Sequence, residues 1–112
     1  MALVAIAAGI YLTFFHSSGF EKMKAIMQSF RAPQSAFGGV KIEGVLDYLP
    51  GINGLPSADV IKFLMENNCS VVIRPSGTEP KMKAYISVSA QDKPACEVIQ
   101  ARIKEDLDKF FC

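Results

Sequence analysis

The sequence predicts an α+β fold in the order β-α-β(4)-α, with a mostly antiparallel sheet and two helices on one of its faces. Two segments repeat apolar residues at helical spacing, and several shorter segments are rich in β-branched and aromatic residues. Turn-forming residues separate these segments. Each predicted helix has one apolar stripe, and a single sheet face can bury both stripes.

Length and composition limit the chain to one domain with few long-range electrostatic preferences. Its 112 residues are 50% hydrophobic, and its 12 basic and 11 acidic side chains give a net charge of +1. This balance provides no general attraction to nucleic acid or to an anionic membrane, so we expect neither partner, and any anion site must be local. The three widely spaced cysteines, Cys69, Cys96 and Cys112, fit reduced thiols in a cytoplasmic protein.

The first fifteen residues form an apolar run whose function the sequence does not decide. No basic region precedes the run, which argues against a secretory signal. The run ends at His16, short of the roughly 20 residues that a membrane span needs. We predict a strand at residues 10–15. Residues 1–9 are interpreted as an apolar leader of unclear origin, and residues 10–112 as the domain.

Two helices are predicted from their start and stop signals. Ser18 and Glu21 have capping-box spacing, and Pro33 ends the first helix. Residues 34–39 are predicted to be a linker. Asp92 and Pro94 open the last helix. Its sheet-facing residues are expected to be Ala95, Ile99, Ile103, Leu107 and Phe110.

Four further strands are predicted at residues 40–48, 60–66, 69–74 and 82–89. In the first of these, simple alternation places one set of residues on the apolar face: Val40, Ile42, Leu46 and Tyr48. The same alternation exposes Lys41, Glu43 and Asp47 to solvent. Residues 60–66 would also accept a short helix, but the Asn67-Asn68 turn signal favours one strand of a hairpin.

The loop between the last two predicted strands has the composition of a phosphate site. Arg74 offers a planar, permanently charged fork that can donate two parallel hydrogen bonds to a phosphate group. Ser76 and Thr78 add hydroxyl donors, and Gly77 can turn successive backbone N–H groups toward an anion. The alternative is an ordinary hairpin connection in which Ser-Gly and Glu-Pro pairs only turn the chain.

The octet R-P-S-G-T-E-P-K at residues 74–81 resembles the C-terminal, fourth domain of the α-D-phosphohexomutases, the phosphoglucomutase/phosphomannomutase family. Leu55-Pro56 and the V-I-K-F-L segment at residues 60–64 extend the resemblance. It implies a TATA-binding-protein-like fold. Carried over residue by residue, it also implies that four residues bind substrate phosphate: Arg74, Ser76, Gly77 and Thr78. Glu79 and Lys81 would support them.

The resemblance implies an enzyme that interconverts hexose 1-phosphate and hexose 6-phosphate, of which this chain supplies one domain. The sequence contains no D-G-D-x-D metal loop, no serine–histidine nucleophile motif and no G-E-x-S-G sugar loop. We therefore assign no catalytic and no metal-binding residue here, expect the isolated domain to be inactive, and expect Mg²⁺ in the full-length parent. The expected partners are a hexose phosphate and the parent's other domains. The alternative is a free-standing module that binds a phosphorylated ligand or a protein.

Overall fold

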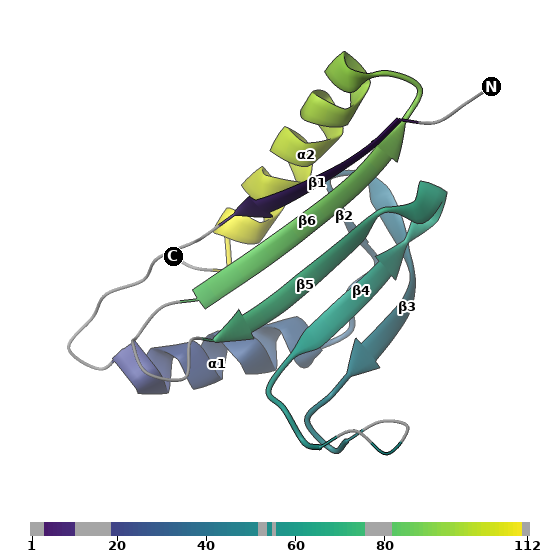
Figure 1. Ribbon diagram of the computed structural model, residues 1–112. Helices are drawn as coiled ribbons and strands as arrows, with labels where there is room; N and C mark the ends of the chain where they lie inside the picture. The colour runs from purple at the N-terminus through teal and green to yellow at the C-terminus, as the bar shows by residue number, and fades with distance from the viewer. Residues whose placement is uncertain (1–3, 11–18, 52–53, 55, 76–81, 111–112) are drawn as a thin grey trace.

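The computed structural model describes residues 4–10, 19–51, 54, 56–75 and 82–110, which form one antiparallel sheet and two α-helices (Figure 1). The six strands lie in the order β1-β6-β5-β4-β3-β2, and every neighbouring pair is antiparallel. In chain order the elements are β1 (Val4–Ile10), α1 (Gly19–Arg31), β2 (Ala36–Phe37), β3 (Val40–Asp47), β4 (Ile61–Met65), the 3₁₀ turn η1 (Glu66–Asn68), β5 (Ser70–Pro75), β6 (Met82–Ala90) and α2 (Lys93–Asp108). The predicted α+β class and element order are confirmed, with the short β2 added.

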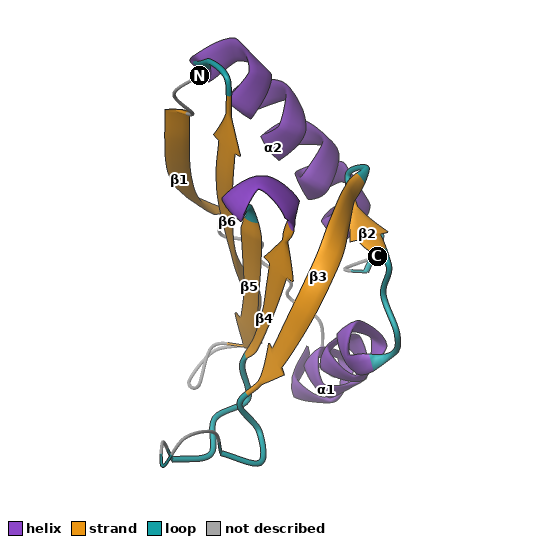
Figure 2. Cartoon of the chain, turned by 90° about the vertical axis from the view of Figure 1, so that its right-hand side faces the viewer, coloured by secondary structure: helices purple, strands orange, loops and turns teal. Residues whose placement is uncertain are grey.

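Both helices cover the same face of the sheet, as predicted (Figure 2). Helix α2 contacts β6, β1 and β2, whereas α1 contacts β5. Apolar side chains from the two helices and the strands fill the space between the layers, and the largest fully buried ones include Met27, Phe30, Phe37, Phe63, Ile73, Ile86, Ile103 and Leu107. The opposite sheet face carries no described helix, and we call it the open face.

The end of α1 and the start of α2 follow local signals in the sequence, whereas Ser18 of the predicted capping box lies outside the described residues. Helix α1 ends at Arg31, two residues before Pro33. Helix α2 begins after Asp92, whose side chain accepts a hydrogen bond of 2.9 Å from the backbone N–H of Ala95. This bond satisfies one of the N–H groups that a helix start leaves without a backbone partner. The predicted stripe of α2 faces the core, where Ile103 and Leu107 are fully buried and Ala95, Ile99 and Phe110 are partly buried.

The uncertain segment at residues 60–66 is a strand, as favoured. Strand β4 forms a hairpin with β5, in which Phe63 pairs with Val71. Asn67 and Asn68 take positive φ angles of 58° and 60° at the turn. Asparagine tolerates this left-handed conformation better than most residues, so the Asn-Asn pair determines where the chain reverses.

Strand β3 contains an irregularity that simple alternation did not predict. Ile42 pairs with Met65, but the next pair is Gly44 with Leu64, so Glu43 is an extra residue on β3. One inserted residue is a β-bulge, and it moves every later side chain of that strand to the opposite face.

The bulge corrects the predicted faces of β3. Asp47 pairs with Ile61, whose side chain is fully buried beneath the helices, and Leu46 pairs with Lys62. Directly paired residues share a face, so Asp47 points toward the helix layer and Leu46 toward the open face. The prediction that Leu46 lies with Ile42, and that Asp47 is merely solvated, was wrong.

The first strand also differs from its predicted position. β1 spans Val4–Ile10 and pairs along its whole length with β6, from Val4 opposite Ala90 to Ile10 opposite Ala84. It overlaps the strand predicted at residues 10–15 only at Ile10, and residues 11–18 lie outside the described part of the chain. Most of the segment interpreted as a leader therefore contributes a strand, while the domain boundary itself stays a prediction.

The predicted linker at residues 34–39 contains strand β2 and a tight turn. Gly38 and Gly39 have φ angles of 59° and 80°, and the backbone N–H of Gly38 donates a 2.5 Å hydrogen bond to the carboxylate of Asp106 on α2. Phe37 is 1% exposed and packs edge-on against Phe63 at a centroid distance of 4.9 Å. This segment therefore anchors the sheet edge to the second helix instead of linking two elements loosely.

Candidate functional site

Arg74 is the next-to-last residue of β5 and the first residue of the predicted phosphate loop. Its side chain is exposed, while the preceding residue, Ile73, is fully buried. The other residues predicted for the site, Ser76, Gly77, Thr78, Glu79 and Lys81, lie outside the described residues. Of the predicted site residues, the structure therefore describes only Arg74. The pairing of its strand with the neighbouring strands determines where its side chain lies.

Arg74 shares the open face with two lysines on the strands to either side. It pairs directly with Lys83 on β6, and its neighbour on that face, Val72, pairs with Lys62 on β4. Because opposite residues share a face and alternate residues repeat it, Lys62, Arg74 and Lys83 emerge on one surface. We call these three residues the cationic face.

The cationic face has a strongly positive local composition although the whole chain is nearly neutral. The open-face positions in the described parts of β4, β5 and β6 carry no acidic residue, and Tyr85 lies across from Val72 in the same surface. Clustered positive side chains can attract an anion locally. This surface is therefore the candidate for a local anion site.

Lys62 and Lys83 were not predicted as site residues. Their only signal in the sequence is alternation with apolar residues, which indicates a solvent-facing position and nothing more. Their proximity to Arg74 depends on the register between β4, β5 and β6, which one sequence does not determine.

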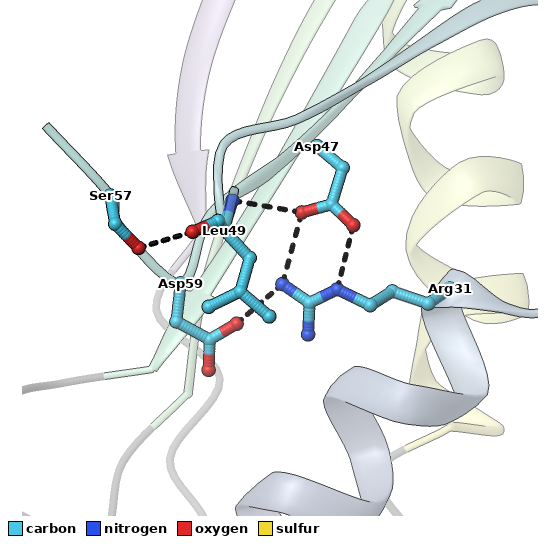
Figure 3. A network of polar contacts seen from close by, with 5 residues as sticks. All are labelled: Arg31, Asp47, Leu49, Ser57 and Asp59. Atoms are coloured by element: carbon cyan, nitrogen blue, oxygen red, sulfur yellow. Dashed lines mark hydrogen bonds and ion pairs between the residues drawn. The ribbon is translucent and has the colours of Figure 1, made fainter. Parts of the chain in front are cut away.

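A second polar cluster lies at the same end of the sheet, on the helix side (Figure 3). The guanidinium of Arg31, the last residue of α1, donates two hydrogen bonds to Asp47, of 2.9 Å from Nε and 3.2 Å from one Nη. The same Nη donates a 2.6 Å bond to Asp59. We call these three residues the Arg31 clasp.

The clasp perturbs the ionisation of its members. The hydrogen bond from Arg31 lowers the pKa of Asp47, although desolvation acts in the opposite direction, and the Leu49 N–H adds a bond of 3.0 Å. The hydrogen bond to Asp47 raises the pKa of Arg31. The fork of one arginine therefore contacts both carboxylates and favours the anionic form of Asp47.

Backbone bonds close the base of the loop between β3 and β4, beside the clasp. The N–H of Tyr48 donates to the carbonyl of Val60 at 2.9 Å, and the N–H of Ala58 donates to the carbonyl of Tyr48 at 3.0 Å. The hydroxyl of Ser57 donates to the carbonyl of Leu49 (Figure 3). The loop at residues 48–60 is thus fixed at its two ends, which the clasp joins to α1.

Within the described part of the chain, the remaining chemistry-bearing side chains give no second candidate site. His16 and Cys112 lie outside the described residues, and Cys69 and Cys96 are buried thiols that form no disulfide. Within the described ranges, no three His, Cys, Asp or Glu side chains gather closely enough to hold a metal ion. No described helix is both long and apolar enough to cross a membrane.

The geometry supports anion binding by charge and hydrogen bonding. The guanidinium of Arg74 can neutralise an anion by its charge and orient it by its parallel N–H donors.

Comparison with known proteins points to a single enzyme type. No family model matches the chain. A phosphoglucomutase of Staphylococcus saprophyticus is 35% identical over 92 residues, which cover 71% of this chain and 16% of that enzyme. A phosphoglucomutase of Staphylococcus aureus strain USA300 is 37% identical over 83 residues, covering 62% of this chain and 15% of that enzyme.

Solved structures also match the chain, and one of them is a protein from Paramecium. It is the open form of pp63/parafusin, an exocytosis-sensitive phosphoprotein and phosphoglucomutase from Paramecium, with a TM-score of 0.49 and 16% sequence identity. It covers 96% of this chain, which in turn covers 21% of it.

This chain spans less than one fifth of the length of the bacterial enzymes that it matches. The sequence similarity nevertheless runs through most of the chain, at a level that indicates common descent. The chain is a phosphohexomutase-related domain, homologous to a segment of the bacterial phosphoglucomutases.

Proposed function

We propose that this chain is the C-terminal, substrate-phosphate-binding domain of a phosphoglucomutase or phosphomannomutase. Such an enzyme transfers a phosphoryl group between the 1- and 6-positions of a hexose. The homology to phosphoglucomutases supports the enzyme class, and the R-P-S-G-T-E-P-K octet supports the specific role of this segment.

The observation that carries the proposal is the position of Arg74 at a strand end. Its exposed guanidinium emerges opposite Lys83, on a surface without an acidic residue at the open-face positions of β4 to β6. A phosphate dianion there gains a bidentate, charge-assisted contact from the arginine and a second positive charge from the lysine. In this proposal Ser76, Gly77 and Thr78 complete the phosphate contacts, with Glu79 and Lys81 in support.

The remaining chemistry is assigned to other parts of the parent enzyme. The nucleophile, the Mg²⁺ site and the sugar-binding loop would lie there, while this domain holds the phosphate that is not reacting. Remote binding of this kind helps to position the reacting end of a substrate. The buried, reduced Cys69 and Cys96 support a cytoplasmic location for the protein.

A titration followed by backbone amide shifts tests the proposal directly. Inorganic phosphate and glucose 6-phosphate should shift the amides of residues 74–81 most, and binding should be weak because one domain leaves much of the ligand in water. Arg74→Ala should abolish the shifts. Arg102→Ala removes an equal charge from an exposed position on α2 and should preserve them. The proposal fails if the largest shifts fall around Glu43 and Asp47 or around His16.

A further inference from the structure

We propose that Arg31 is a positioning residue for the anion site, acting through Asp59, which lies just before β4, the strand next to that of Arg74. This inference rests on the proposed phosphate-binding function. It assigns a role to three residues that meet on the helix side of the sheet: Arg31, Asp47 and Asp59.

The first step is that one guanidinium joins three separate elements. Arg31 ends α1, Asp47 ends β3, and Asp59 lies two residues before β4 begins. One Nη of Arg31 contacts both carboxylates, at 3.2 Å and 2.6 Å. The arginine side chain is 21% exposed and the two aspartates 36% and 37%, so this is a part-buried contact and not a fully solvated ion pair.

The second step is that the clasp holds together two groups that otherwise repel. Two carboxylates that approach the same nitrogen repel each other, and the guanidinium between them offsets this repulsion. Loss of Arg31 would therefore push the end of β3 and the start of β4 apart. The same repulsion would strain neighbouring backbone hydrogen bonds, such as the one from the N–H of Tyr48 to the carbonyl of Val60.

The third step connects the start of β4 with the anion site. Asp59 is two residues before Ile61, and Ile61 pairs directly with Ile73, the residue that precedes Arg74. Arg74 is the next-to-last residue of β5, which ends at Pro75. The clasp thus fixes the chain next to the Ile61–Ile73 pair, which is the first pair between β4 and β5. The position of this pair determines the direction in which the guanidinium of Arg74 points.

The test is phosphate affinity, measured by amide shifts under conditions in which each variant is fully folded. Arg31→Ala should weaken phosphate binding by roughly threefold or more, within the usual range of coupling between linked groups. Arg102→Ala is the control for removing one positive charge, and it should change affinity less. If Arg31→Ala does not fold, Arg31→Lys serves instead, because lysine keeps the charge but cannot engage both carboxylates as a fork.

Asp59→Asn separates positioning from simple electrostatics. Removing a negative charge near Arg74 should tighten phosphate binding if charge alone matters, whereas loss of the clasp should weaken it. Asp106→Asn is a matched control, because Asp106 has the same side-chain exposure of 37% and accepts a backbone bond at α2, away from the site. In the Arg31→Ala background, Asp59→Asn should cause no further loss.

The outcomes distinguish this inference from the proposed function. If the wild-type chain binds no phosphate at residues 74–81, the proposed function fails and the inference fails with it. If the wild type binds but the Arg31 variant binds equally well, or Asp59→Asn binds more tightly, only the positioning role is overturned. Weaker binding in both single variants without further loss in the double variant supports the role.

Discussion

Arg74 and Lys83 lie directly opposite each other on neighbouring strands, so two positive side chains emerge at the same rung of the sheet. Like charges in directly opposed positions destabilise a sheet. In the proposed function, a bound phosphate would face both positive charges at this rung.

Replacing the fork of Arg74 should damage binding without damaging the fold. Arg74→Lys keeps the charge but loses one of two charge-assisted hydrogen bonds, at a cost to phosphate binding of roughly 1.5–3 kcal/mol. The melting temperature without phosphate should barely change, because the side chain is exposed. Calorimetric melting with and without phosphate measures both effects. A large fall in melting temperature without ligand would show that Arg74 is a structural residue.

The isolated chain should not convert glucose 1-phosphate to glucose 6-phosphate. Binding a phosphate group lowers no barrier unless a nucleophile and a phosphoryl donor are also in place. A coupled assay on protein purified from a host lacking its own phosphoglucomutase would measure this. Turnover that follows the protein through purification would contradict the assignment of the chain as a binding domain.

The two glycines of the β2–β3 turn should respond differently to alanine. Gly39→Ala introduces only backbone strain, because a Cβ there meets no atom within 4 Å, and should cost about 1–2 kcal/mol of unfolding free energy. A Cβ on Gly38 would lie 2.6 Å from the backbone nitrogen of Ile103, which adds overpacking to the same strain. We expect Gly38→Ala to lower the free energy of unfolding by roughly 2–5 kcal/mol.

Chemical denaturation of both glycine variants measures the difference. Equal costs would mean that the turn does not dock on α2 as closely as the structure indicates.

Acidification should remove the contribution of the Arg31–Asp47 bond to stability. The pKa of Asp47 is lowered in the folded chain, so its contribution is fully present above the unfolded-chain pKa of about 3.9 and is lost as the pH falls through the folded value. The unfolding free energies of the wild type and Asp47→Asn should therefore differ near neutral pH and converge well below pH ~4. A difference that stays constant with pH would assign the effect of the substitution to packing.

Features of the fold that depend on local chemistry could be read from the sequence. The start of α2 follows from Asp92 and Pro94, and the β4–β5 reversal follows from Asn67 and Asn68, because caps and turns act within a few residues. Features that depend on pairing could not. The β-bulge at Glu43 is defined only by the pairing of β3 with β4, and it determines which face of the sheet Asp47 occupies.

The same distinction explains the site and the first strand. Arg74 could be predicted as a site residue from the R-P-S-G-T-E-P-K octet. Lys62 and Lys83 could not, because their proximity to Arg74 depends on the register of β4, β5 and β6. The apolar run at residues 2–15 has no alternation that locates a strand within it. Pairing with β6 selects Val4–Ile10, and no local signal distinguishes that stretch from residues 10–15.

The pairing of β1 with β6 makes Val4–Ile10 a cover for one edge of β6. Val4–Ile10 occupies the outer hydrogen-bonding edge of β6 from Ala84 to Ala90, which is most of that strand. A shortened chain that starts at residue 11 would expose this edge as a template for strands from other molecules. Such a chain should self-associate with rising concentration where the full chain stays monomeric, and sedimentation velocity would separate the two behaviours.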